Sequence, residues 1–130
     1  ISAALENKKI PIYGAGCQIR DWLFVEDHVE ALLQVAKKAS PGELFNVGGG
    51  TELENIKLAQ IICRQLEVKL KKPPGYYEKL IMFVEDRAGH DFRYSINPKL
   101  IEDRLGWSTK TVFTQAIENT LEYYISIGPN

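Results

Sequence analysis

A glycine turn between two short apolar segments, with an amphipathic stretch close behind, limits the possible folds of this chain more than any other feature. Ile10–Tyr13 has the composition of a short strand, and Gly14 and Gly16 supply the turn that follows. Residues 18–25 again contain strand-forming side chains, and the apolar spacing after them predicts a helix over Asp27–Lys38. The order of strand, turn, strand and helix predicts an α/β unit.

Short strands and helices continue to alternate along the rest of the chain. Glu43–Val47 and Leu80–Val84 are predicted as strands, the second as a continuous apolar run typical of a buried strand. Thr51 and Glu54 have the spacing of a capping box, which predicts that the next helix starts there. Further helices are predicted at residues 1–8, between Asn97 and Gly106, and over Val112–Ile125. The predicted fold class is therefore mixed α/β.

Three of these helices carry an apolar stripe with the spacing of one helical face. The predicted core-facing residues are Val29, Leu32, Leu33 and Ala36 in the first, Ala59, Ile62, Cys63 and Leu66 in the second, and Phe113, Ala116, Ile117, Thr120, Leu121 and Tyr124 in the last. Cys63 is accordingly predicted to be a small core residue. Trp22 and Trp107 are expected in the core rather than as platforms for a base.

Composition narrows the functional classes. The 130 residues are 45% hydrophobic and 25% charged, which suits one globular domain over residues 1–130. The formal net charge of -1 argues against a nucleic acid partner, because binding to phosphate backbones needs clustered positive charge. No apolar run or signal-peptide pattern predicts a membrane or export segment. Two cysteines without a disulfide framework predict free thiols and a cytoplasmic location.

Motifs for cofactor and metal chemistry are missing. Three glycines at residues 48–50 stand between a predicted strand and a predicted helix, but the third glycine of a dinucleotide fingerprint would fall at Leu53. His28 and His90 lie far apart in sequence, and no pair of cysteines or histidines has ligand spacing. We therefore expect this chain to bind neither a dinucleotide nor a metal ion.

The glycine turn is one candidate for a phosphate or nucleotide clamp. It has the aromatic Tyr13 on one side and Arg20 on the other. The planar guanidinium of arginine donates two parallel hydrogen bonds and keeps its charge, which suits a diphosphate. The alternative is a simple hairpin in which Arg20 pairs with Asp21 or Asp27.

A second candidate is the polar block of residues 86–94, which follows a predicted strand. Arg87 and His90 both donate hydrogen bonds and would face a phosphate in this interpretation. The alternative is a loop in which opposite charges compensate one another. Such a loop would pair Asp86, Arg87, Asp91 and Arg93.

Three blocks in this order resemble the C-terminal part of the nucleotide-sugar 4,6-dehydratases, in the extended short-chain dehydrogenase family. They are the run from Pro11 to His28, which includes Gln18-Ile19-Arg20-Asp21-Trp22, then Asn46-Val47-Gly48-Gly49 and Asp86-Arg87-Ala88-Gly89-His90-Asp91, followed by Leu105-Gly106-Trp107 and the last helix. The family usually has proline at the position of Ala88. Its dinucleotide fingerprint, Tyr-x-x-x-Lys pair and acidic dyad are expected upstream of Ile1. The resemblance implies the substrate-binding part of such an enzyme, with the Rossmann half missing and no catalytic residue in this chain.

The resemblance also implies a role for each candidate residue. Pro11, Ile12 and Tyr13 would lie along the nucleotide base, Arg20 and Arg87 would grip the diphosphate, Asn46 would bond the diphosphate or ribose, and His90 would complete the phosphate side. Asp21, Asp27 and Asp91 are expected to hold the arginines or the backbone in place.

The family enzyme is a lyase of deoxysugar biosynthesis that converts dTDP-glucose to dTDP-4-keto-6-deoxyglucose with bound NAD. For this chain the resemblance implies a dTDP-sugar ligand, with the UDP-sugar of a related epimerase, dehydratase or decarboxylase as runner-up. A hypothesis of another class is a stand-alone, non-catalytic nucleotide-binding or interaction module. Without the Rossmann half, uncovered apolar surface predicts self-association.

Overall fold

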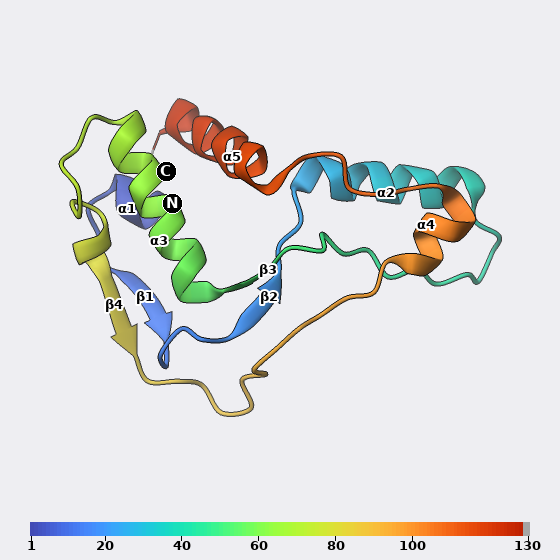
Figure 1. The fold of residues 1–130 in the computed structure, drawn as a ribbon, viewed down its shortest axis with the longest axis horizontal. Coiled ribbons are helices and arrows are strands. Elements are labelled where there is room, and N and C mark those ends of the chain that lie inside the picture. The colour runs from blue at the N-terminus through green and yellow to red at the C-terminus, as the bar shows by residue number, and fades with distance from the viewer. Residues whose placement is uncertain (129–130) are drawn as a thin grey trace.

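A computed structural model describes residues 1–128 as a mixed α/β fold, which confirms the predicted fold class. Its elements are α1 (Ser2–Leu5), β1 (Ile10–Tyr13), β2 (Ile19–Asp21), α2 (Val25–Lys38), β3 (Glu52–Glu54), α3 (Asn55–Lys69), the 3-10 turn η1 (Glu78–Leu80), β4 (Ile81–Val84), α4 (Lys99–Leu105) and α5 (Phe113–Ile127). Figure 1 shows α1, α3, β1 and β4 at one end of the molecule, α2 and α4 at the other, and β2 and β3 between them.

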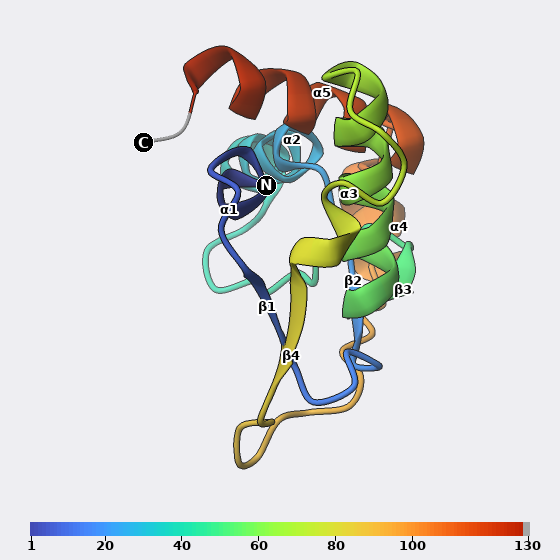
Figure 2. The same cartoon turned by 90° about the vertical axis from the view of Figure 1, so that its left-hand side faces the viewer.

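The strands form two separate two-stranded sheets within the described residues. β1 pairs in parallel with β4, so that Tyr13 lies opposite Val84. β2 pairs antiparallel with β3, so that Arg20 lies opposite Leu53. Figure 2 shows β1 and β4 running side by side toward the same end, where each leads into a loop. The parallel pairing therefore brings the glycine turn after β1 and the polar block after β4 to one edge.

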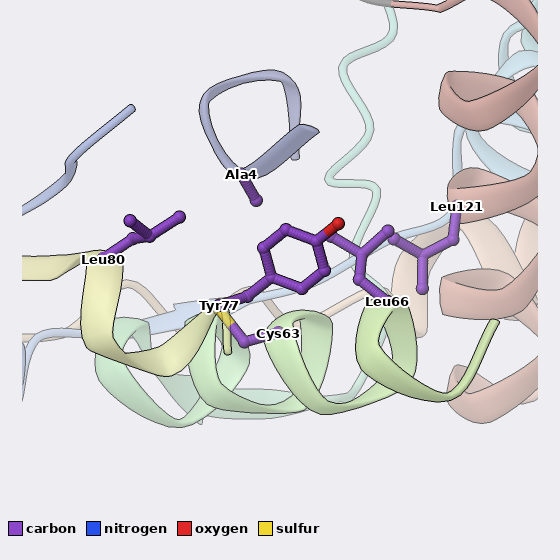
Figure 3. Close-up of a cluster of buried hydrophobic side chains, with 6 residues drawn as sticks. All are labelled: Ala4, Cys63, Leu66, Tyr77, Leu80 and Leu121. Atoms are coloured by element: carbon purple, nitrogen blue, oxygen red, sulfur yellow. The ribbon is translucent and has the colours of Figure 1, made fainter. Parts of the chain in front are cut away.

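Two groups of buried apolar residues hold the elements together. The first joins α1, α3, η1 and α5 and consists of Ala4, Cys63, Leu66, Tyr77, Leu80 and Leu121. Figure 3 shows the Tyr77 ring between Ala4 of α1 and the α3 residues, with Leu121 reaching in from α5. The second group lies at the α2 and α4 end and consists of Ala31, Ile101, Leu105 and Trp107. The glycine turn after β1 and the polar block after β4 lie at the far ends of these strands, away from the first group.

Several local predictions are confirmed. β1 has its predicted bounds, and α5 buries Ala116 and Leu121 from the predicted stripe. On α3, Cys63 and Leu66 are fully buried as predicted. α4 ends at Leu105, and its C-cap Gly106 has a φ of 69°, in the left-handed region that suits glycine. Trp107 is buried as expected, whereas Trp22 is half-buried.

The apolar stripe of α2 is exposed, contrary to the prediction that it faces the core. Its exposed members are Val29, Leu32, Leu33 and Ala36. The buried positions of this helix are Asp27 and Ala31, on its opposite face. Helical spacing determines which residues share a face, but burial depends on what packs there. Within residues 1–128, α4 packs against the face of α2 that carries Ala31, which is opposite the apolar stripe.

Two predicted strands differ from the structure. Residues 18–25 do not form one strand, because β2 ends at Asp21 and α2 already begins at Val25. Glu43–Val47 is not a strand, since no strand in the described part of the chain pairs with it. Its side chains Phe45 and Val47 pack instead against the group around Ile101.

The start of α3 and the burial of β4 also differ from prediction. Thr51 precedes β3, and the N-cap of α3 is Glu54, without a side-chain capping hydrogen bond, so the predicted capping box is wrong. β4 begins at Ile81 and leaves Met82 and Phe83 exposed, so it is not a fully buried strand. Its one strand neighbour among residues 1–128 is β1, and an apolar run is buried only where other elements cover both faces.

Candidate functional site

The edge where β1 and β4 end is closed by a backbone hydrogen bond at a glycine. The Gly14 amide donates to the Val84 carbonyl over 2.9 Å, which continues the strand pairing into the turn. Gly14 has a φ of +56°, and a β-carbon there would lie 2.9 Å from Oδ2 of Asp86. Residues with a side chain rarely adopt that conformation, and a β-carbon there would have to displace the Asp86 carboxylate. The glycine turn is thus what allows the polar block to pack against β1.

Asp86 connects the two loops at this edge. Its Oδ2 accepts a hydrogen bond from Nε2 of Gln18 over 2.7 Å, and its Oδ1 lies 2.6 Å from Nδ1 of His90. The Arg87 amide also donates to Oδ1. The hydrogen bond with His90 is the largest cause that lowers the pKa of Asp86. The carboxylate thereby fixes His90, whose side chain is 6% exposed, with its ring edge-on to Tyr13 at 6.2 Å between centroids.

The polar block then returns to β2. The Ile19 amide donates to the Phe92 carbonyl over 2.8 Å, and the Tyr94 amide donates to the Ile19 carbonyl over 3.1 Å. Arg93 donates two hydrogen bonds, each of 2.8 Å, to the carboxylate of Glu52 on β3. The block therefore runs along the β2 and β3 pair and brings its side chains next to Arg20.

Arg20 is held by carbonyl groups and an aromatic ring. Its Nη1 donates to the carbonyl of the preceding residue, Ile19, over 2.7 Å, and its Nη2 donates to the main-chain oxygen of Asp91 over 2.9 Å. The guanidinium carbon lies 4.5 Å from the centroid of the Tyr94 ring. Asp91 accepts a hydrogen bond from the Tyr94 hydroxyl and raises the pKa of Tyr94, and the charges of Arg20 and Arg87 oppose that shift. Arg20 therefore contacts the loop that also contains Arg87.

Neither Arg20 nor Arg87 forms an ion pair within residues 1–128, so both alternatives that pair them with carboxylates are wrong. Asp21 instead accepts from the amides of Gly49 and Thr51, and Asp27 accepts from the amide and hydroxyl of Thr111. These two aspartates hold backbone in place, as expected. Arg93 pairs with Glu52 rather than with an aspartate of its own loop.

The predicted site residues fall into three groups. Tyr13 and Arg20 contact the polar block, to which Arg87 and His90 belong. Pro11 and Tyr13 share the exposed face of β1, whereas Ile12 is half-buried. Asn46 is exposed in the segment before Gly48, and among the described residues its side chain has no hydrogen bond to that cluster.

Sequence reasoning assigned no role to Gln18 or Tyr94. Gln18 is 7% exposed, and it reaches Asp86 across 68 positions in sequence. Tyr94 reaches Arg20 only because the polar block lies beside β2. Both contacts depend on strand pairing between distant segments, which no local pattern reports. Polar or aromatic residues at an otherwise apolar strand edge are the one signal that could have drawn attention to them.

The glycines before β3 do not fit a dinucleotide. The Gly49 amide donates to the carboxylate of Asp21, and a β-carbon at Gly49 would lie 2.3 Å from the Trp22 carbonyl oxygen. At Gly48 it would lie 2.6 Å from Oδ2 of Asp21. The two glycines allow the chain to pack against Asp21 and Trp22. The Gly49 amide, which a pyrophosphate would need, already donates to Asp21. We therefore assign no NAD contact to this loop.

A cavity of about 720 Å³ lies away from these residues. It is bounded by α3, α5 and the segment between β2 and α2, and its lining includes Trp22, Phe24, Leu58, Ile117 and Tyr124. Glu26 is the one charged side chain in its lining within the described chain. Among residues 1–128, no group of three potential ligands is arranged to hold a metal ion, and no helix is long and apolar enough to span a membrane.

Comparisons with known proteins identify the relatives of this chain. The dTDP-glucose 4,6-dehydratase of Haemophilus influenzae is 45% identical over 128 residues, which are 96% of this chain and 38% of that protein. The crystal structure of the Bacillus anthracis dTDP-glucose 4,6-dehydratase in complex with NAD is 37% identical, with a TM-score of 0.77 over 96% of this chain and 37% of that one. DesIV, the dTDP-glucose 4,6-dehydratase of Streptomyces venezuelae with NAD and TYD bound, is 30% identical, with a TM-score of 0.82 and coverages of 96% and 36%.

Fold, loop geometry and these matches together define the C-terminal part of an extended short-chain dehydrogenase of the dehydratase type. The model of the GDP-mannose 4,6-dehydratase family matches residues 1–120, and the chain belongs to that family. It spans little more than a third of the length of the relatives named above.

Proposed function

We propose that this chain is the nucleotide-sugar-binding domain, residues 1–130, of a dTDP-glucose 4,6-dehydratase. The observation that carries the proposal is the contact of Arg20 with Asp91 and Tyr94 of the loop that also contains Arg87, with neither arginine in an ion pair within residues 1–128. Two such guanidinium groups match the charge and geometry of a diphosphate. The names of the relatives support dTDP-glucose as the substrate of the whole protein.

The remaining residues would complete a nucleotide site around that diphosphate. The exposed face of β1 with Pro11 and Tyr13, next to Ile12, would lie along the base, because an aromatic edge and strand backbone suit a flat ring. His90 would add a donor on the phosphate side from the position that Asp86 fixes. Asn46 would bond the ribose or diphosphate. Binding of this remote part of the substrate would orient the hexose toward groups that this chain does not contain.

In the whole protein, NAD and the catalytic groups would belong to a preceding Rossmann half, which is the first partner that we propose. The exposed stripe of α2 and the side chain of Leu44, which is 87% exposed, offer apolar surface for such a contact. For the isolated chain, the same surface supports self-association. The free thiols of Cys17 and Cys63 accord with a cytoplasmic location.

Calorimetric titration of this chain with dTDP, UDP and NAD tests the proposed ligand. We expect dTDP to bind, UDP to bind more weakly and NAD not to bind. Arg20→Ala should weaken dTDP binding by about 1.5–3 kcal/mol, the range for hydrogen bonds to charged groups. Arg64→Ala is the matched control, because Arg64 is an exposed arginine of α3 that pairs with Glu78. Equal affinities of the two variants would refute the diphosphate role, and tighter binding of UDP would favour a UDP-sugar enzyme.

Sedimentation over a broad range of concentrations tests the proposed self-association. Leu33→Glu places a charge in the exposed stripe of α2 and should shift the chain toward monomer. Val68→Glu changes an even more exposed apolar residue of α3, which lies outside that stripe, and should leave association unchanged. A wild-type chain that remains monomeric at every concentration would contradict the proposal.

A further inference from the structure

Asp91 lies beside Arg20 without forming an ion pair with it. The Nη2 group of Arg20 donates to the main-chain oxygen of Asp91 over 2.9 Å, so the two residues are in direct contact. The carboxylate of Asp91 instead accepts the hydrogen bond of the Tyr94 hydroxyl. An aspartate that contacts a half-buried arginine through its main chain would ordinarily use its carboxylate instead, because charge-assisted hydrogen bonds are stronger than those to a neutral carbonyl.

Tyr94 contacts both members of this potential pair. Its hydroxyl holds the Asp91 carboxylate, and the face of its ring lies under the Arg20 guanidinium at 4.5 Å. Its backbone is fixed by the hydrogen bond from its amide to the Ile19 carbonyl. A ring face attracts a cation without neutralising it, whereas a carboxylate at the same place would compete with any anionic ligand.

We propose that Tyr94 is a positioning residue that keeps the Asp91 carboxylate from pairing with Arg20, so that the guanidinium stays available to the diphosphate of a nucleotide. This inference rests on the proposed function and adds to it the reason why Arg20 forms no ion pair with Asp91. It gives separate tasks to the two parts of one side chain: the hydroxyl holds the carboxylate, and the ring supports the cation.

Titration of four variants with dTDP separates these tasks. Tyr94→Phe keeps the ring and releases the carboxylate, and it should weaken dTDP binding about tenfold, within the range of coupling energies between contacting residues. Asp91→Asn should bind at least as tightly as the wild type, because no carboxylate remains to compete. The double variant Tyr94→Phe with Asp91→Asn should recover wild-type affinity. Tyr94→Leu with Asp91→Asn should stay weak, because the ring is lost.

Rescue by Asp91→Asn is the deciding observation, since general loosening of the loop would not be repaired by a second substitution. If the double variant binds as weakly as Tyr94→Phe alone, or if Tyr94→Phe binds like the wild type, the inference is overturned. Weaker binding of Arg20→Ala in the same series would leave the proposed function standing in either case.

A readout without ligand keeps the inference testable even if dTDP does not bind to the wild-type chain, which would count against the proposed function alone. At pH 7 the NMR signal of the Arg20 Nε–H group should have a different chemical shift in Tyr94→Phe than in the wild type, because the released Asp91 carboxylate would lie against the guanidinium. The double variant should return the signal to its wild-type position. Equal chemical shifts in the wild type and Tyr94→Phe would refute the role of Tyr94.

Discussion

Oδ1 of Asp86 lies 2.6 Å from Nδ1 of His90, and its other carboxylate oxygen lies 2.7 Å from Nε2 of Gln18. Asp86 therefore joins the loop after β4 to the turn after β1, at the edge where we place the nucleotide. We therefore expect protonation of this carboxylate to affect both the stability of the folded chain and the arrangement of the two loops.

The contribution of Asp86 to stability should depend on pH. Its pKa is lowered in the folded state, chiefly by the hydrogen bond with His90, so the carboxylate stabilises the fold above the pKa of an unfolded aspartate. That contribution should be lost as the pH falls through the lower, folded pKa. We expect Asp86→Asn to reduce the melting temperature at pH 6 and to have little effect near pH 2. Glu85→Gln, at the exposed neighbouring position, should show no such dependence, and equal curves for both variants would contradict the prediction.

Gly16→Ala should destabilise the chain more than Gly42→Ala. Both glycines have positive φ, 72° and 89°, and alanine there costs about 1–2 kcal/mol from backbone strain. A β-carbon at Gly16 would also lie 2.6 Å from Cγ2 of Ile12 and 2.8 Å from Cβ of Ile56, whereas nothing lies within 4 Å at Gly42. Overpacking of this kind adds about 1–3 kcal/mol. Urea denaturation measures the difference, and equal losses would mean that the contacts around Gly16 relax freely.

The two thiols should differ in reactivity. Cys17 is exposed, whereas Cys63 is fully buried, and desolvation is the main cause that raises the pKa of Cys63 to about 11. The thiolate is the reactive form of cysteine. A disulfide reagent at pH 8 should therefore modify Cys17 rapidly and Cys63 only when the chain unfolds. Cys17→Ser should remove the rapid phase. Two rapid phases in the wild type would show that the core around Cys63 opens easily.

Leu66→Ala should lower the free energy of unfolding by about 2–5 kcal/mol, the usual cost of a leucine cavity in a core. Leu66 is fully buried between α1, α3 and α5. Leu44→Ala is the matched control, because this leucine is 87% exposed, and its loss should cost at most about 0.5 kcal/mol. Denaturant unfolding of the two variants tests the prediction. A large effect of Leu44→Ala would indicate that the Leu44 side chain is covered in solution.

The parts of the fold that depend on local pattern could be predicted from the sequence. The left-handed end of α4 follows from Gly106, and the bounds of β1 follow from its flanking turn residues. The burial of Cys63 follows from its place on the apolar face of α3. In each case the chemistry of neighbouring residues determines the local conformation or the shared face.

Features that depend on distant partners could not be predicted in this way. Glu43–Val47 has strand-forming residues, but a strand exists only where another strand pairs with it. The stripe of α2 has correct helical spacing, yet the packing of α4 determines which face is buried. The candidate arginines could be chosen by residue type, whereas the contact of Arg20 with Tyr94 required the position of the polar block beside β2.

The parallel pairing of β1 with β4 also constrains when the binding edge can form. These strands are separated by everything from the glycine turn to η1, so their contact must wait until most of the chain is available. Closing so long a loop costs entropy that the shorter connections do not incur. During synthesis on a ribosome, β1 would leave the exit tunnel long before its partner, and its backbone would remain unpaired through that interval. The edge where we propose that the nucleotide binds would then be among the last parts of the chain to mature.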